Sequence, residues 1–217
     1  MATVLEMLQW HEGKIEKMER EYRRNLINSI SGYKSANLIG SCDAEGQNNL
    51  AIFSSVVHIG ANPAYMGIVI RPKTVPRHTY NNIKETQYFT INAIQKHFFG
   101  KVHQTSANYP ASLSEFNEAG LTPLHSELHP APYVAESDIR IGLELSEELP
   151  VKSNGTIIII GKVIEIQIAP KLVGPDGFVN LSKADIVAIS GLDAYNEVRP
   201  LERMAYARPG TPPSSLK

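Results

Sequence analysis

The chain has 217 residues, of which 42% are hydrophobic and 20% are charged, as in globular proteins that bury a core. Its 21 basic and 22 acidic residues nearly cancel, which excludes a general polyanion-binding surface, so we expect neither nucleic acid nor a membrane as a partner. The single cysteine, Cys42, excludes an intrachain disulfide and every cysteine-rich zinc site. Residues 1–25 lack the apolar core of a secretory signal, so we expect a cytoplasmic protein.

The N-terminal segment carries the pattern of a long helix over residues 3–27. Apolar side chains recur at three- and four-residue spacing from Val4 to Leu26, after a capping-box pair formed by Thr3 and Glu6. The opposite face carries Glu-to-Arg pairs four residues apart, Glu16–Arg20 and Glu19–Arg23. We expect this helix to pack on the body of the protein or on a partner subunit.

After Gly32 the chain consists of short β-rich runs that are separated by turns. Alternation and β-branched content predict strands, with a turn at Asp43–Gly46 and a bulge or bend at Gly161. The predicted strands are 36–42, 50–59, 65–70, 88–94, 139–145 and 157–168. The interruptions are two short helices, 74–86 and 112–120 (the second with a Ser112/Glu115 capping box), and an irregular loop over 123–132.

Strands joined mostly by turns rather than helices predict a mainly β protein, an antiparallel barrel or sandwich with peripheral helices. The composition has no break that requires two such domains. We therefore expect a helical extension over residues 1–30, one barrel domain over 31–207 and a mobile Pro- and Ser-rich tail over 208–217.

Several common chemistries have no support in the sequence. A dinucleotide-binding glycine fingerprint, a phosphate-binding lysine loop, a nucleophile elbow and a His-Glu-x-x-His zinc pair are all absent. His125 and His129 have a metal-ligand spacing, but Pro123 and Pro130 bracket them, so a regular helix is not expected there and we predict no metal site. Cys42 ends a strand-like run and is most simply a buried apolar residue.

Residues 48–55 form the first segment with unusual chemistry. Ala51, Ser54 and Ser55 stand where a core strand normally has bulky side chains. Small residues let a planar ligand approach the strand backbone, and the hydroxyl groups can donate to a phosphate or a ribityl oxygen. The alternative is an edge strand with one hydrated face.

Residues 71–83 form the second such segment. Arg71, Lys73, Arg77 and His78 gather there without an acidic neighbour, and Thr74 or Thr79 can cap the helix that follows. Free amides and the positive end of the helix dipole would then face the same anion as the arginines, and a phosphate monoester fits such a pocket. The alternative is a solvated basic loop. A strand for a flat ring beside a pocket for a phosphate suggests FMN.

Four stretches carry a resemblance to a known family: residues 31–72, 77–94 (RHTYNNIKETQYFTINAI), 103–123 (HQTSANYPASLSEFNEAGLTP) and 156–166 (TIIIIGKVIEI). With these stretches and Gly191–Tyr195, the sequence resembles the flavin reductase-like family of FMN-binding split barrels, in particular its flavoredoxin-like branch. The resemblance implies a Greek-key split barrel, non-covalent FMN, and a homodimer with FMN near the interface, where Phe98, Phe99 and the N-terminal helix would be buried.

The resemblance also assigns residues to the cofactor. The strand would contact the flavin through Asn49, Ala51, Phe53, Ser54 and Ser55, several of them by backbone groups. The phosphate would bind at Arg71, Arg77, Thr79 and Asn82, and the stretch after the next strand adds Thr105 and Ser106.

The activity that the resemblance implies is transfer of a hydride from NAD(P)H to the flavin. Such chemistry belongs to the cofactor, so we assign no catalytic residue, and structural roles are expected for His58, His78 and His103. Many reductases of the family carry a histidine just before the strand at 156, where this chain has Asn154 and Gly155. That difference favours the first alternative, an FMN-binding electron carrier fed by a separate reductase. Further alternatives are a haem- or pyridoxal-phosphate-type split barrel and a protein-binding module with an unused pocket.

Overall fold

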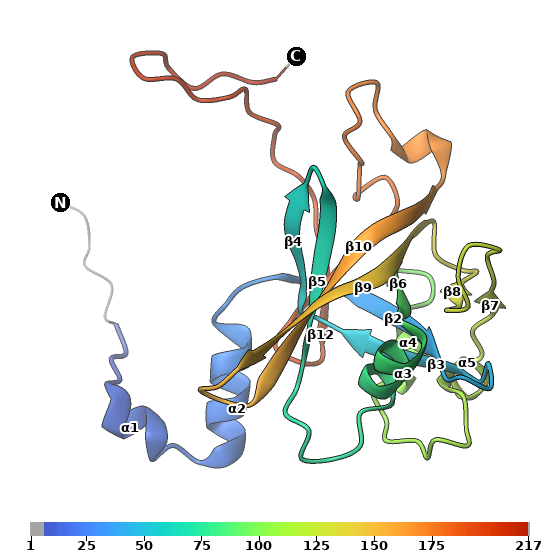
Figure 1. Cartoon of the computed structure of the whole chain (residues 1–217). Coiled ribbons are helices and arrows are strands. Elements are labelled where there is room, and N and C mark those ends of the chain that lie inside the picture. The colour runs from blue at the N-terminus through green and yellow to red at the C-terminus, as the bar shows by residue number, and fades with distance from the viewer. Residues whose placement is uncertain (1–6, 217) are drawn as a thin grey trace.

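The computed structural model describes residues 7–216, and its main feature is a seven-stranded antiparallel sheet in the order β3-β2-β6-β9-β10-β5-β4 (Figure 1). The strands are β2 (Asn37–Cys42), β3 (Asn48–Phe53), β4 (Val56–Ala61), β5 (Ala64–Ile70), β6 (Tyr88–Ala93), β9 (Ile139–Val151) and β10 (Thr156–Ile168). The edge strands β3 and β4 do not pair with each other, so the sheet is open, as in a split barrel. The expected mainly β split-barrel fold is confirmed.

Smaller elements surround this sheet. A three-stranded sheet consists of β1 (Lys34–Ser35), β11 (Val187–Ser190) and β12 (Ala194–Glu197), and a two-stranded one of β7 (Pro123–Leu124) and β8 (Tyr133–Val134). The helices are α1 (Glu12–Glu16), α2 (Arg20–Ser29), α3 (His78–Thr86), α4 (Phe99–Gln104), α5 (Glu115–Ala119) and a 3-10 turn at Pro170–Leu172. None of these helices is long and apolar enough to cross a bilayer.

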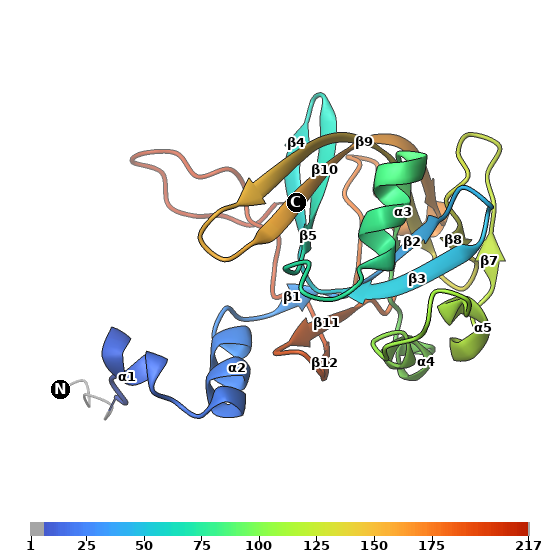
Figure 2. The same cartoon turned by 60° about the horizontal axis from the view of Figure 1, so that its bottom comes forward.

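The apolar core lies on both sides of the β2–β3 layer. Alternate residues of a strand face opposite sides, so Leu38 and Ile39 on β2 belong to different clusters. The first cluster takes in Val102 of α4 and Phe116 of α5, and the second takes in Ile83 of α3. Figure 2 shows α3 on one side of β2 and β3, with α4 and α5 on the other. The two faces of β3 are therefore buried by different helices.

The irregularity predicted at Gly161 is present, but the extra residue there is Ser146 of β9, and β10 carries its own extra residue at Ile164. The pairing register of β10 with β9 shifts between Ile160 and Gly161. A Cβ atom at Gly161 would lie 2.7 Å from the Phe89 ring and 2.9 Å from Cβ of Leu143. The glycine therefore allows β10 to pass close to the core side chains of its neighbours.

The N-terminal prediction of a single helix over residues 3–27 is wrong within the described residues. The chain forms α1 and α2 with a break at residues 17–19, and Glu19 begins the second helix by accepting a hydrogen bond from the Tyr22 amide at 2.9 Å. Glu16 and Arg20 therefore do not share one helix. The Thr3–Glu6 capping box lies outside the described residues.

Smaller differences concern boundaries. The predicted strand over 50–59 is divided into β3 and β4, and α3 begins at His78 rather than Thr74. The helix predicted over 112–120 begins at Glu115 after Ser114, without a side-chain cap, so the Ser112/Glu115 capping box does not form. The sequence patterns also missed α4 and the pairing of β7 with β8 at the two ends of the predicted loop.

Candidate functional site

The first predicted segment forms β3, and its alternation puts Asn49, Ala51 and Phe53 on one face of the strand. Asn49 and Phe53 lie on the side of α3, because Asn49 contacts Thr79 and Phe53 packs on the second cluster. The intervening residues Leu50 and Ile52 face the first cluster instead. The two predicted segments thus meet in the structure, because one face of β3 and the start of α3 lie on a common surface.

A buried polar network joins these two elements. The Asn49 side-chain amide donates to the hydroxyl of Thr79 at 3.1 Å and to that of Ser41 at 3.3 Å. Asn82, one turn after Thr79 on α3, donates to the same Ser41 hydroxyl at 3.3 Å. All four residues are buried, and Ser41 is the cross-strand partner of Asn49. Sequence reasoning missed Ser41, because no local signal distinguishes it from other small residues of a strand.

The N-terminus of α3 has the features of an anion site. Its N-cap residue, Arg77, makes no side-chain cap, and the first helical hydrogen bond runs from the Asn81 amide to the Arg77 carbonyl. The amides of residues 78–80 consequently have no acceptor within the helix. These amides and the helix dipole favour a bound anion.

The two predicted arginines differ in their settings. The guanidinium of Arg77 donates to the Pro72 carbonyl from Nε at 3.3 Å and from Nη2 at 3.2 Å, which folds the segment before α3 back on itself. Arg77 is half-buried, and Arg71, directly after β5, is exposed. An arginine keeps five N–H donors, so Arg77 retains donors for an anion while it holds this loop.

Ser54 and Ser55 lie in the short connection between β3 and β4. Ser55 is tied to β5, since its hydroxyl donates to the Val69 carbonyl at 3.3 Å and the Val69 amide donates to the Ser55 carbonyl at 3.2 Å. Both serines are half-buried. The structure therefore keeps them at the end of the same strand that carries Asn49.

Thr105 and Ser106 lie away from this surface. Their hydroxyls donate to the carbonyls of Val102 and His103 in α4, at 2.9 and 2.7 Å. Because α4 packs into the first cluster, these two residues are on the side of β3 opposite to α3. The structure does not bring them together with Thr79 and Asn82.

A pocket opens beside the start of α3. Asn48 contributes a side-chain oxygen to its wall that is buried and has no hydrogen-bond partner among the described residues. Glu115 also lines the pocket, and its carboxylate accepts a hydrogen bond from the Leu50 amide of β3 at 3.0 Å. The lining residues are Asp43, Gln47, Asn48, Asn49, His78, Asn82, Pro110, Ala111, Leu113 and Glu115. Sequence reasoning missed Glu115 because it is far from Leu50 along the chain.

This arrangement fits a ligand that has an anionic end and donor groups. The uncapped helix supplies donors for a phosphate, and the unpartnered Asn48 oxygen requires a donor such as a hydroxyl or an imide N–H. FMN carries a phosphate, hydroxyl groups and an imide N–H, so the residues present fit this cofactor.

Asn154 and Gly155 form the turn between β9 and β10. The Asn154 side chain accepts from the Thr156 amide at 3.0 Å and from its hydroxyl at 2.7 Å. A Cβ atom at Gly155 would lie 3.7 Å from Pro72, so this turn lies beside the loop that Arg77 holds. The asparagine is thus used to stabilise the turn.

The family model described as the flavin reductase like domain matches residues 30–181, which is most of the chain. The protein therefore belongs to the flavin reductase-like family, a flavin-binding family, and the resemblance seen in the sequence is confirmed.

Solved structures agree with this assignment. A candidate flavin reductase with a split-barrel domain from Shewanella frigidimarina is 43% identical, with a TM-score of 0.89 over 93% of this chain and 100% of that one. Nitrilotriacetate monooxygenase component B from Bacillus cereus is 22% identical (TM-score 0.81; 91% and 98% covered). Flavoredoxin from Desulfovibrio vulgaris is 21% identical (TM-score 0.68; 82% and 92% covered). The last two show a shared fold only.

Proposed function

We propose that this protein binds FMN non-covalently between β3 and the N-terminus of α3 and acts as a flavin-dependent oxidoreductase. The observation that carries the proposal is the uncapped start of α3, with Arg77 and Thr79, facing Asn49 on the neighbouring strand. A phosphate monoester at the helix start matches FMN, whose phosphate ends a flexible ribityl chain.

In this proposal each group of residues has a separate task. Arg77, Thr79 and the amides of residues 78–80 hold the phosphate, with Arg71 and Asn82 nearby. The face of β3 that carries Asn49, Ala51 and Phe53, with Ser54 and Ser55 at its end, supports the ring and the ribityl chain. FMN itself would supply the redox chemistry by taking a hydride from NAD(P)H. The protein orients the cofactor and needs no general acid or base for that step.

The second candidate function is an FMN-binding electron carrier that a separate reductase feeds. The observation that favours it is the turn at Asn154, whose side chain is bonded to Thr156 at the position where many reductases of the family carry a histidine. Without a nicotinamide contact there, reduction would come from a partner protein.

We also propose a homodimer. The helices α1 and α2 have no buried residue, and Tyr22, Ile27 and Ile30 are exposed by 53%, 47% and 67%. Figure 2 shows these helices projecting from the body. Phe99 is also 40% exposed, whereas Phe98 is 4% exposed within its own chain and needs no partner to bury it. A second copy would cover the apolar side chains of the arm.

One experiment separates the candidates. The purified protein is saturated with FMN, its visible spectrum is recorded, and NADH or NADPH is added without oxygen. We expect a flavin spectrum that bleaches, which identifies a reductase and its donor. A flavin spectrum that persists would move the function to electron carriage. A haem spectrum, or no flavin bound after addition of FMN, would contradict the proposal.

A further inference from the structure

Residues 122–136 form a strap whose two ends are joined. The Ala135 amide donates to the Thr122 carbonyl at 2.9 Å, and the Glu136 carboxylate accepts both the amide and the hydroxyl of Thr122. The two-residue strands β7 and β8 pair directly inside this junction. The segment between them, residues 125–132, is therefore a loop with a fixed base.

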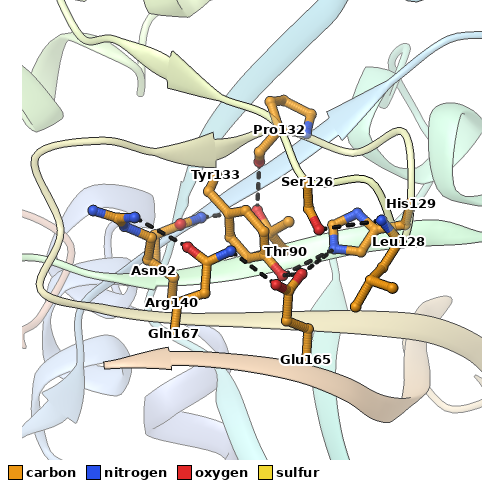
Figure 3. Close-up of polar contacts among 10 residues, drawn as sticks. All are labelled: Thr90, Asn92, Ser126, Leu128, His129, Pro132, Tyr133, Arg140, Glu165 and Gln167. Carbon is orange, nitrogen blue, oxygen red and sulfur yellow. Dashed lines mark hydrogen bonds and ion pairs between the residues drawn. The ribbon is translucent and has the colours of Figure 1, made fainter. Parts of the chain in front are cut away.

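The returning half of the strap is anchored on the main sheet (Figure 3). The Thr90 hydroxyl donates to the Pro132 carbonyl at 2.7 Å, and the Val134 amide donates to Asn92 Oδ1 at 3.0 Å. Glycines of the sheet make room for these contacts. A Cβ atom at Gly40 would collide with the Pro132 carbonyl, and one at Gly142 would collide with the Tyr133 hydroxyl.

His129 is the part of the loop that turns inward. Its side chain is 0% exposed, and its Nε2 lies 2.9 Å from the Tyr133 hydroxyl and 3.7 Å from Glu165 Oε2. Tyr133 donates its single hydrogen to Glu165 at 2.8 Å, so this network assigns the neutral ring's hydrogen to Nε2. Nδ1 is then a buried acceptor, and no donor among residues 7–216 meets it.

The groups that face His129 come from several elements. Tyr88 of β6 stacks on the ring, Tyr133 and Glu165 face Nε2 from β8 and β10, and the Ala131 backbone lies within the loop. Arg140 of β9 is linked to Glu165 by way of Gln167, which accepts a hydrogen bond from Arg140 and donates one to Glu165 (Figure 3). Glu165 is thus the one acidic side chain that this network places against the imidazole.

These surroundings keep the closed network in one charge state near neutral pH. Burial lowers the pKa of His129, although Glu165 and the Ala131 backbone oppose the shift, so the ring is neutral there. Burial acts to raise the pKa of Glu165, but hydrogen bonds from Gln167, Ser126 and Tyr133 outweigh it and hold the pKa below its usual range.

The strap also reaches the candidate flavin pocket. His125 Nε2 lies 3.4 Å from Asn48 Nδ2, and Asn48 lines that pocket with its unpartnered oxygen. A displaced loop would remove His125 from Asn48 and free this side chain.

We propose that protonation of His129 releases the loop 125–132 from the sheet and thereby loosens the flavin pocket at Asn48. The coupling to the pocket rests on the proposed function, whereas the release of the loop does not. In the open loop the imidazole is hydrated and has an ordinary pKa of about 6.5. The open form therefore binds the proton more tightly, and the closed fraction falls as the pH drops below that value.

Hydrogen exchange of the full-length protein, followed by mass spectrometry between pH 7.5 and 5, tests the release. We expect the protection factors of amides 126–129 and 131, corrected for intrinsic rates, to fall by up to about tenfold per pH unit below about pH 6.5. In His129→Gln this pH dependence should disappear. The matched control is His125→Gln, which changes the exposed histidine of the same loop and should keep the pH dependence.

Protection that stays constant over this range, or an equal fall in His129→Gln, would overturn the proposal. If His129→Gln does not fold, Glu165→Gln replaces it. Removal of the carboxylate charge lowers the pKa of His129 in the closed loop further, so the fall in protection should still begin near pH 6.5 and be at least as large, whereas a smaller or absent fall contradicts the proposal.

The coupling to the pocket has its own measurement, the affinity for FMN over the same pH range. A loss of affinity that parallels loop release and is absent in His129→Gln supports it. Loop release with a constant FMN affinity overturns the coupling alone. Absence of FMN binding at pH 7.5 refutes the proposed function and leaves the exchange result intact.

Discussion

At the scale of single residues, the candidate site is organised before any ligand arrives. Asn49 and Asn82 share the Ser41 hydroxyl, and Asn49 also holds Thr79, so β2, β3 and α3 are fixed relative to one another by buried hydrogen bonds. Side chains that are held in this way need little reordering when a ligand binds, which favours affinity.

The combined variant Arg77→Ala and Thr79→Ala tests the placement of the phosphate. Loss of the guanidinium and the hydroxyl should weaken FMN binding by a few kcal/mol, or about a hundredfold or more, as measured by fluorescence titration. The matched control is Asn81→Ala, at an exposed position of the same helix, which should bind FMN normally. An unchanged affinity in the double variant would place the phosphate elsewhere.

Which site residues could be predicted from the sequence depends on their spacing along the chain. Asn49 and Thr79 were found because each belongs to a local segment of unusual composition, and the structure brings those segments into contact. Ser41 and Glu115 act through long-range contacts and have ordinary neighbours. Arg71 and Arg77 were predicted as equivalent, but only Arg77 holds its own loop.

At the scale of elements, Gly161 shows how a single glycine lets the long strand β10 pack closely where its register with β9 shifts. β10 pairs with β9 on one side and with β5 on the other, and it passes Phe89 at Gly161 without room for a side chain. The sequence signal was a glycine inside an alternating strand, which is typical of a bulge or a bend, but it did not show that the extra residue lies on the neighbouring strand β9.

Gly161→Ala should therefore destabilise the fold. The new methyl group meets the Phe89 ring and Cβ of Leu143, and such overpacking typically costs about 1–3 kcal/mol in the free energy of unfolding, measured by urea denaturation. The control is Gly100→Ala in α4, where no atom lies within 4 Å of the added Cβ, and where alanine favours the helix. Equal stabilities for the two variants would contradict this account of Gly161.

Predictions of elements succeeded where a pattern is enforced by the core and failed where it is not. The strands of the main sheet were found because their alternating residues are buried between helices or neighbouring strands. The N-terminal helix was predicted too long, because α1 and α2 bury no residue and local capping by Glu19 decides where the second helix begins. Periodicity alone does not locate such a break.

At the scale of the whole molecule, the chain consists of a packed body and an arm with few attachments. Lys34 joins the end of α2 to the body by donating to the carbonyls of Asn28 and Gly191, both at 2.9 Å. At the other end of the chain, residues 203–216 double back on themselves, with the Ala205 amide bonded to the Ser214 carbonyl. The proposed dimer accounts for the apolar side chains on the arm.

Light scattering after gel filtration tests this dimer. The full-length protein should have about twice the chain mass of 23.9 kDa, and a chain lacking residues 1–30 should be shifted toward the monomer. The point variant Ile27→Arg, on the exposed apolar face, should act in the same direction, whereas Asn25→Arg, elsewhere on α2, should not. A monomeric full-length protein would contradict the proposal.

The hydrogen bond from Leu50 to Glu115 has a consequence for how these molecules behave when crowded. β3 is an edge of the open sheet, and bare edges recruit strands from other molecules into growing aggregates. Glu115, the first residue of α5, occupies one outward amide of this edge with a negative charge. A strand from another molecule would have to displace this carboxylate before it could pair along β3, which disfavours addition to the open edge.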